Sequence, residues 1–191
     1  MIETSWARIE GWMQLHAPEA FAALRGGAST ERIDTAEQSL GLELSDPFRR
    51  SVSQHDGQEQ RWPSLVEFGF LMPLEAIVEA VRRNERYGID EVELEDAVWW
   101  RRGWVPFVSR DGDYISLALG SSWQRNVGEV WCFQHDMEPI HSLIAPDFAT
   151  WLARWAGDLE AGVFYLDRAA GAGLLPHPGQ VSRLWPADAG Q

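Results

Sequence analysis

The first part of the chain has apolar residues at helical spacing. They fall on one face of each of two predicted helices: Trp6, Ile9 and Met13 in the first, Phe21 and Leu24 in the second. Thr4 or Ser5 is a suitable N-cap for the first helix. Pro18 interrupts the pattern and fits the first turn of the second helix.

Two further helices are predicted between residues 29 and 55. Ser29 or Thr30 is a suitable N-cap for the earlier one, and Gly41 is a natural stop just past its end. The later one begins at Ser45-Asp46-Pro47 and closes with the turn Asp56-Gly57. Their apolar faces are Ile33, Ala36 and Leu40, and then Phe48, Val52 and His55.

The period of the pattern changes after residue 65. Val66, Phe68 and Phe70 alternate with Glu67 and Gly69, which predicts a strand. Pro73 then opens a helix. Its inward face is predicted to consist of Leu74, Ile77, Val78 and Val81.

A small antiparallel sheet is predicted from residue 105 onward. Strands at 105–108 and 114–119 flank Arg110-Asp111-Gly112-Asp113, whose Asp-Gly pair is typical of a two-residue hairpin turn. Further strands are predicted at 129–134 and 140–143. Together with the helices, these strands indicate an α+β protein, with a mainly antiparallel sheet against which helices pack.

A final helix and a tail complete the predicted organisation. The helix begins at Ala145-Pro146-Asp147 and stops at Gly162. We expect residues 1–165 to form one domain. Residues 166–191, where Gly and Pro crowd, are expected to be a tail with little regular structure. The residues that could fix parts of this tail to the body are Leu174, Leu175, Leu184 and Trp185.

Composition excludes several classes of function. The formal net charge of −13 makes the chain a poor partner for nucleic acid or an anionic membrane. All 16 basic residues are Arg, which removes lysine Schiff-base and P-loop chemistry. A single cysteine, Cys132, rules out a disulfide framework and a multi-cysteine metal site within one chain. With no membrane-span run or signal-peptide pattern, we expect a cytoplasmic protein.

No motif indicates a catalytic, metal or cofactor site. Cys132 and His135 lie three apart on a predicted strand, so their side chains leave opposite faces, and Cys132 is expected in the core. Asp111 and Asp113 resemble the start of a calcium loop, whose later glycine and glutamate are missing. We predict no metal, no cofactor and no catalytic residues. A hydrolase that uses Asp111, Asp113 and His135 is the enzymatic alternative.

One local feature suggests a partner surface. The acidic segment consists of Asp90, Glu91, Glu93, Glu95 and Asp96, and Trp99 and Trp100 follow it. One interpretation is a solvated loop with the two tryptophans at the edge of the core. The other is an electrostatic attraction for a basic partner, with aromatic anchors beside it and with Asp111 and Asp113 on the same surface. The 11 tryptophans of the chain allow both interpretations, as core fillers or as anchors.

Four stretches in a fixed order resemble a known family. The first runs from Ser29 through Leu40-Gly41 to Pro47-Phe48, and the second is His55-Asp56-Gly57-Gln58. The third is Trp104-Val105-Pro106-Phe107 with Gly112-Asp113-Tyr114. The fourth is Gly128-Glu129-Val130 through His135-Asp136 to Phe148-x-x-Trp151-Leu152. Over about residues 5–162 this order is similar to that of the SUKH superfamily, which includes fungal Smi/Knr-type cell-wall regulators and bacterial toxin-immunity proteins. Asp56 departs from the family's usual Asn, and Ser45-Asp46 interrupts its Leu-Pro pair.

The resemblance implies a fold and a function class. It implies an α+β fold, no enzymatic activity and no cofactor. It suggests a bacterial immunity protein that holds a cognate toxin domain, such as a nuclease, through that partner's basic surface. A housekeeping regulator or scaffold of the Smi/Knr type is the alternative.

Overall fold

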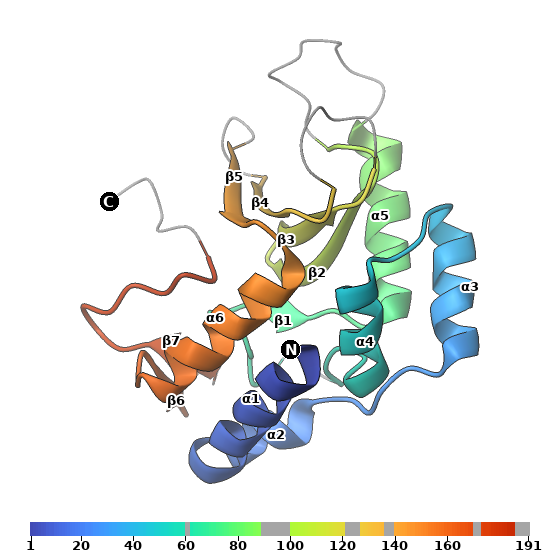
Figure 1. The fold of residues 1–191 in the computed structure, drawn as a ribbon. Coiled ribbons are helices and arrows are strands. Elements are labelled where there is room, and N and C mark those ends of the chain that lie inside the picture. Colours follow the sequence, from blue (N-terminus) through green and yellow to red (C-terminus); the bar gives the residue numbers. More distant parts are fainter. Residues whose placement is uncertain (60–61, 89–99, 121–126, 136–139, 170–172, 186–191) are drawn as a thin grey trace.

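The computed structural model combines a five-stranded antiparallel sheet with helices packed against it (Figure 1). It describes residues 1–59, 62–88, 100–120, 127–135, 140–169 and 173–185. The strands follow one another across the sheet in chain order: β1 (Phe70–Leu71), β2 (Trp104–Arg110), β3 (Asp113–Ala118), β4 (Val130–Gln134) and β5 (Ile140–Ala145). The predicted α+β class is confirmed.

Helix boundaries follow the local signals closely, with one exception. The helices are α1 (Ile2–His16), α2 (Pro18–Ala23), α3 (Thr30–Leu40), α4 (Asp46–Gln54), α5 (Leu74–Gly88) and α6 (Phe148–Glu160). Ser29 caps α3 by accepting from the Arg32 backbone N–H, and Gly41 ends it in the left-handed conformation. The predicted cap at Thr4 or Ser5 is wrong. Burial of Ile2 in the core extends α1 to the start of the chain, and its N-cap is Met1.

The strand predicted at residues 66–70 is mostly a turn. Glu67 and Phe68 have φ values of +44° and +65°, and Val66 and Gly69 exchange backbone hydrogen bonds around them. Only Phe70 continues into β1, which pairs with β2. Alternation of apolar and polar residues predicts an extended chain, but here Phe68 points to solvent and the alternation does not mark a buried face.

Tryptophan fills the core. Trp151 of α6 packs edge-on against Phe107 of β2, with ring centroids 4.8 Å apart, and Trp155 meets Trp6 of α1 at 5.8 Å. Most of the tryptophans in the described ranges are buried, whereas Trp62 is half-exposed. The core-filling interpretation therefore accounts for most of them.

The predicted tail contains more regular structure than its composition indicates. Strands β6 (Phe164–Asp167) and β7 (Gly173–Pro176) form a hairpin that crosses the expected boundary at residue 165. Leu174, Leu184 and Trp185 are buried in the main core, and the Trp151 indole donates to the Leu184 carbonyl at 3.4 Å. Figure 1 shows this segment running beside α6. A few apolar residues are thus enough to hold the C-terminal segment against the body of the protein.

Candidate interaction surface

Most of the residues predicted to contact a partner lie outside the described residues. These are Asp90, Glu91, Glu93, Glu95, Asp96 and Trp99. They follow α5 in the sequence, and the description resumes at Trp100. Their role as contacts stays a prediction.

Trp100 itself lies in the core. Its side chain is 1% exposed. Its ring stands edge-on to Trp104, Tyr114 and Phe133, with centroids 5.4 to 5.7 Å away. This placement corresponds to the alternative in which the tryptophan belongs to the core, so we do not include Trp100 in a proposed surface.

Asp111 and Asp113 occupy the predicted hairpin turn between β2 and β3. Asp111 and Gly112 have φ values of +46° and +105°, as a two-residue turn of this type requires. Asp111 is exposed. Asp113 accepts from the His135 backbone N–H at 2.9 Å, and its carboxylate also lies 2.9 Å from His135 Nδ1. Asp113 therefore ties the turn to the end of β4.

The same contact brings together two members of the enzymatic alternative. A Cβ atom on Gly112 would lie 2.7 Å from His135 Cε1, so the imidazole packs closely against the turn. Arg110, at the end of β2, places its guanidinium 4.2 Å from the Trp185 ring centroid. Asp113 and His135 thus anchor the β2–β3 turn to the end of β4, and Arg110 joins β2 to the C-terminal segment.

The described residues contain neither a cluster of metal-ligating side chains nor a membrane-spanning helix. Within the described ranges, no group of three or more His, Cys, Asp or Glu side chains is placed to hold a metal ion. Cys132 is buried, as expected for a core cysteine. No helix in the same ranges combines the length and the apolar character that crossing a membrane requires.

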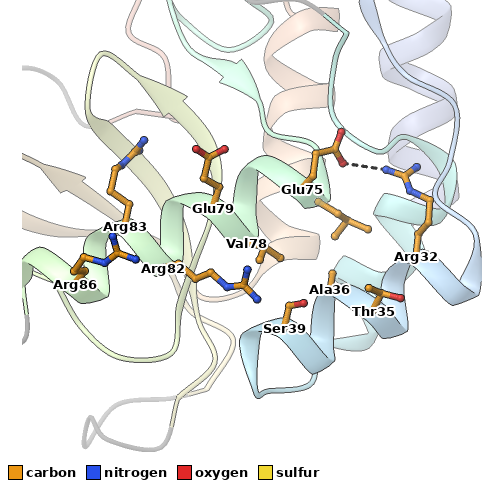
Figure 2. A pocket seen from close by; sticks show the side chains of 11 residues that line it. Arg32, Thr35, Ala36, Ser39, Glu75, Val78, Glu79, Arg82, Arg83 and Arg86 are labelled. Carbon is orange, nitrogen blue, oxygen red and sulfur yellow. Dashed lines mark hydrogen bonds and ion pairs between the residues drawn. The ribbon is translucent and has the colours of Figure 1, made fainter.

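A groove between α3 and α5 is the feature that the sequence pattern did not predict (Figure 2). Its volume is about 770 Å³, within the range of ligand-binding pockets. Ala36 and Leu74 are buried at its base, and Val78 is half-buried beside them. Val78 lies on the predicted inward face of its helix and packs partly against the core, but its position in a groove depends on how far α3 stands from α5.

An ion network holds one end of this groove together. Asp56 is completely buried, and its Oδ1 accepts from the Leu74 backbone N–H at 2.9 Å, at the start of α5. Its Oδ2 lies 2.6 Å from Arg32 of α3, which also pairs with Glu75 of α5 at 3.0 Å. The turn Asp56-Gly57, one of the motifs of the family resemblance, thus fixes α3 relative to α5.

The network also sets the charge state of Glu75. Partial burial is the largest single influence and raises the pKa of Glu75. Hydrogen bonds from Arg25 and from the backbone, with the charges of Arg25 and Arg32, together outweigh it and lower this pKa below its usual 4.5. Glu75 is therefore ionised and neutralised by its arginine partners at neutral pH.

The other end of the groove is basic. Arg82, Arg83 and Arg86 extend from exposed positions on the second half of α5. Figure 2 shows Arg82 directed across the groove toward Ser39 of α3, whereas Arg83 and Glu79 point away from α3. Arg83 donates to the Tyr114 hydroxyl of β3.

The fold and the site define a class of protein: an α+β protein whose candidate site is an open groove between two helices. The sequence pattern of the SMI1 / KNR4 family (SUKH-1) matches residues 27–154, and the chain belongs to this family. The predicted resemblance is confirmed.

The curated relatives include fungal regulators. The chain is 27% identical to the cell wall biosynthesis/cell cycle regulator smi1 of Schizosaccharomyces pombe, over 87% of this chain and 38% of the relative. It is 23% identical to the glucan synthesis regulatory protein of Neurospora crassa, over 87% of this chain and 40% of that protein. The cell wall assembly regulator SMI1 of Saccharomyces cerevisiae is 22% identical, over 85% and 41%. The chain thus spans about 40% of the length of these relatives.

Proposed function

We propose that this protein is a non-catalytic regulatory module that works by binding another protein. The single observation behind this proposal is the family match over residues 27–154, together with fungal relatives that are named as regulators. It corresponds to the alternative that the sequence analysis kept open, and it replaces immunity as the preferred function.

The geometry supports a binding role. The candidate site is an open groove with an apolar base and a charged rim, which is a common form of peptide-binding surface. The Asp113–His135 pair has a structural explanation in the hairpin anchor. The main features of the described surface can therefore be explained without a chemical step.

Immunity to a toxin is the second candidate, and the net charge of −13 favours it. An acidic protein is attracted to the basic surface that a nuclease uses for its substrate. Asp111, which is exposed at the β2–β3 turn, belongs to the surface that such a partner would meet.

Two measurements separate these functions. In cells that naturally contain the gene, we expect an affinity-tagged chain to recover a reproducible endogenous partner after cross-linking. We also expect a deletion strain to show altered sensitivity to cell-wall stress, rescued by the intact gene. Co-expression with a toxin encoded beside the gene tests immunity. Protection of the cells together with co-purification of that toxin would replace the regulatory proposal.

A further inference from the structure

We infer that the groove between α3 and α5 binds an extended acidic peptide segment of a partner protein, with an apolar side chain on the base of the groove and carboxylates at Arg82 and Arg86. This inference deepens the proposed regulatory function and rests on it. The predicted occupant of the groove is acidic. It therefore differs from the basic partner that the acidic segment at residues 90–96 predicts.

The arginines at the basic end of the groove differ from many others in the chain, because they lack a carboxylate partner among the described residues. In so acidic a chain, guanidinium groups usually find a carboxylate: Arg8 pairs with Glu160, Arg49 with Glu37, and Arg183 with Asp158. Among the residues that the structure describes, Arg82 and Arg86 have no carboxylate within ion-pair distance, and Arg83 donates to a hydroxyl instead. All three belong to the same groove.

The charge balance of the groove lining also favours an anionic occupant. Two glutamates, Glu75 and Glu79, also line the groove. Glu75 is neutralised by Arg25 and Arg32 at the far end, and Glu79 points away from α3 (Figure 2). The half of the groove nearest Arg82 is therefore locally positive on a protein whose net charge is −13. An anionic segment is attracted to this half and repelled elsewhere.

The spacing of the two arginines fits the repeat of an extended peptide. Arg82 and Arg86 are one helical turn apart, so their Cβ atoms lie about 5–6 Å from each other. Alternate residues of an extended peptide lie about 6.6–6.8 Å apart, which matches two flexible guanidinium groups. The residue between two such carboxylates faces the opposite side. The next residue of the same alternation faces the groove with the carboxylates, and it can place an apolar group on Leu74 and Val78.

Other occupants fit less well. A small anion would leave the apolar base formed by Ala36, Leu74 and Val78 uncovered. Nucleic acid would meet the strongly negative remainder of the molecule. An acidic peptide with apolar residues uses both the base and the rim.

The test is fluorescence anisotropy with the full chain and a labelled ten-residue peptide in which Asp and Glu flank spaced leucines. We expect saturable binding that weakens as salt rises from about 50 to about 300 mM, because the contacts are partly electrostatic. A matched peptide with lysine in place of each acidic residue should not bind. Absence of binding by the acidic peptide would overturn the inference.

Matched variants locate the binding. Arg82→Gln with Arg86→Gln should weaken binding about tenfold or more. Arg50→Gln with Arg168→Gln, which removes the same charge from exposed sites outside the groove, should change it less than about twofold. Thr35→Trp, at an exposed position of the groove, should block binding without changing the charge. Equal losses in the two arginine pairs would show non-specific attraction and overturn the inference.

Two further arms complete the test. If the peptide binds only after Asp90, Glu91, Glu93, Glu95 and Asp96 are replaced by Asn or Gln, the chain's own acidic segment is the occupant and the inference is overturned. Inorganic phosphate at millimolar concentration should not displace the peptide, and efficient displacement would identify a simple anion site instead. If the peptide fails to bind while an endogenous partner is still recovered, the groove assignment is wrong and the regulatory function stands.

Discussion

At the scale of single residues, Trp151 occupies a central place in the aromatic packing under α6. It is fully buried and contacts Phe107, Phe148 and Trp155. Its indole N–H also donates to the C-terminal segment at Leu184. The contact set joins a helix, a strand and the end of the chain in one place.

Replacement of Trp151 by alanine should therefore be costly. We expect Trp151→Ala to lower the free energy of unfolding by about 3–5 kcal/mol, because it removes a buried aromatic ring and leaves a cavity. Urea denaturation followed by circular dichroism measures this change. Trp62→Ala, at a half-exposed position, is the control and should have a small effect. A near-native midpoint for Trp151→Ala would contradict this account of the core.

The pH dependence of stability should show the contribution of Glu75. Because its pKa is lowered in the folded state, ionised Glu75 stabilises the fold above its usual pKa of 4.5. This contribution is lost as the pH falls through the lower folded pKa. We expect Glu75→Gln to be less stable than the natural chain near neutral pH and to lose less stability between about pH 5 and pH 3.

Thermal unfolding of both proteins across this pH range is the measurement. Glu43→Gln, at an exposed residue between α3 and α4, is the matched control because it removes the same charge outside the ion network. Parallel profiles for Glu75→Gln and the natural chain would mean that the ion network with Arg25 and Arg32 contributes nothing to stability.

At the scale of elements, the C-terminal segment behaves as part of the fold. Arg183 donates to the almost fully buried Asp158 of α6 at 3.0 Å through its Nε. Leu184 and Trp185 are buried next to it. The composition of this segment predicts a loose tail, yet the segment supplies core residues. Burial of two or three apolar side chains in a complementary site is enough to hold it against the body of the protein.

Substitution in this segment distinguishes a core element from a loose tail. We expect Leu184→Ala to destabilise the protein by about 2–5 kcal/mol, as deletion of a fully buried leucine does. Val181→Ala, three residues earlier and largely exposed, should change stability by less than about 0.5 kcal/mol. Equal effects of the two substitutions in urea denaturation would show that Leu184 is not held in the core.

At the scale of the whole molecule, a small basic region lies on a strongly acidic protein. The chain has a net charge of −13, yet Arg82 and Arg86 form a basic region beside the groove. The acidic segment that begins at Asp90 follows α5 directly in the sequence. Such a distribution favours a partner with both acidic and basic parts.

Reversal of the acidic segment tests its proposed contribution. We expect replacement of Asp90, Glu91, Glu93, Glu95 and Asp96 by arginine to weaken binding of the recovered partner and to reduce its salt dependence. The melting temperature should stay unchanged. Glu43→Arg, outside the segment, is the control. Unchanged affinity across a salt titration would remove this segment from the contact surface.

Local sequence signals determined much of the fold. Ser29, Gly41 and Asp147 define helix ends through short-range backbone bonding, and Asp111-Gly112 defines a hairpin through its positive φ values. The strands β2 to β5 were predictable from short apolar runs bounded by turn and loop residues, although β2 to β4 are buried along most of their length. The order of these motifs also identified the family.

The tertiary structure decided what depends on contacts between distant residues. Residues 66–70, whose alternating pattern predicts a strand, form a turn because the backbones of Val66 and Gly69 are hydrogen-bonded to each other. Leu184 became a core residue because α6 offers it a site. The groove exists because Asp56 and Glu75 hold Arg32, and with it α3, at a set position relative to α5. No local pattern reports such a distance, since it is set by side chains that are tens of residues apart in the sequence.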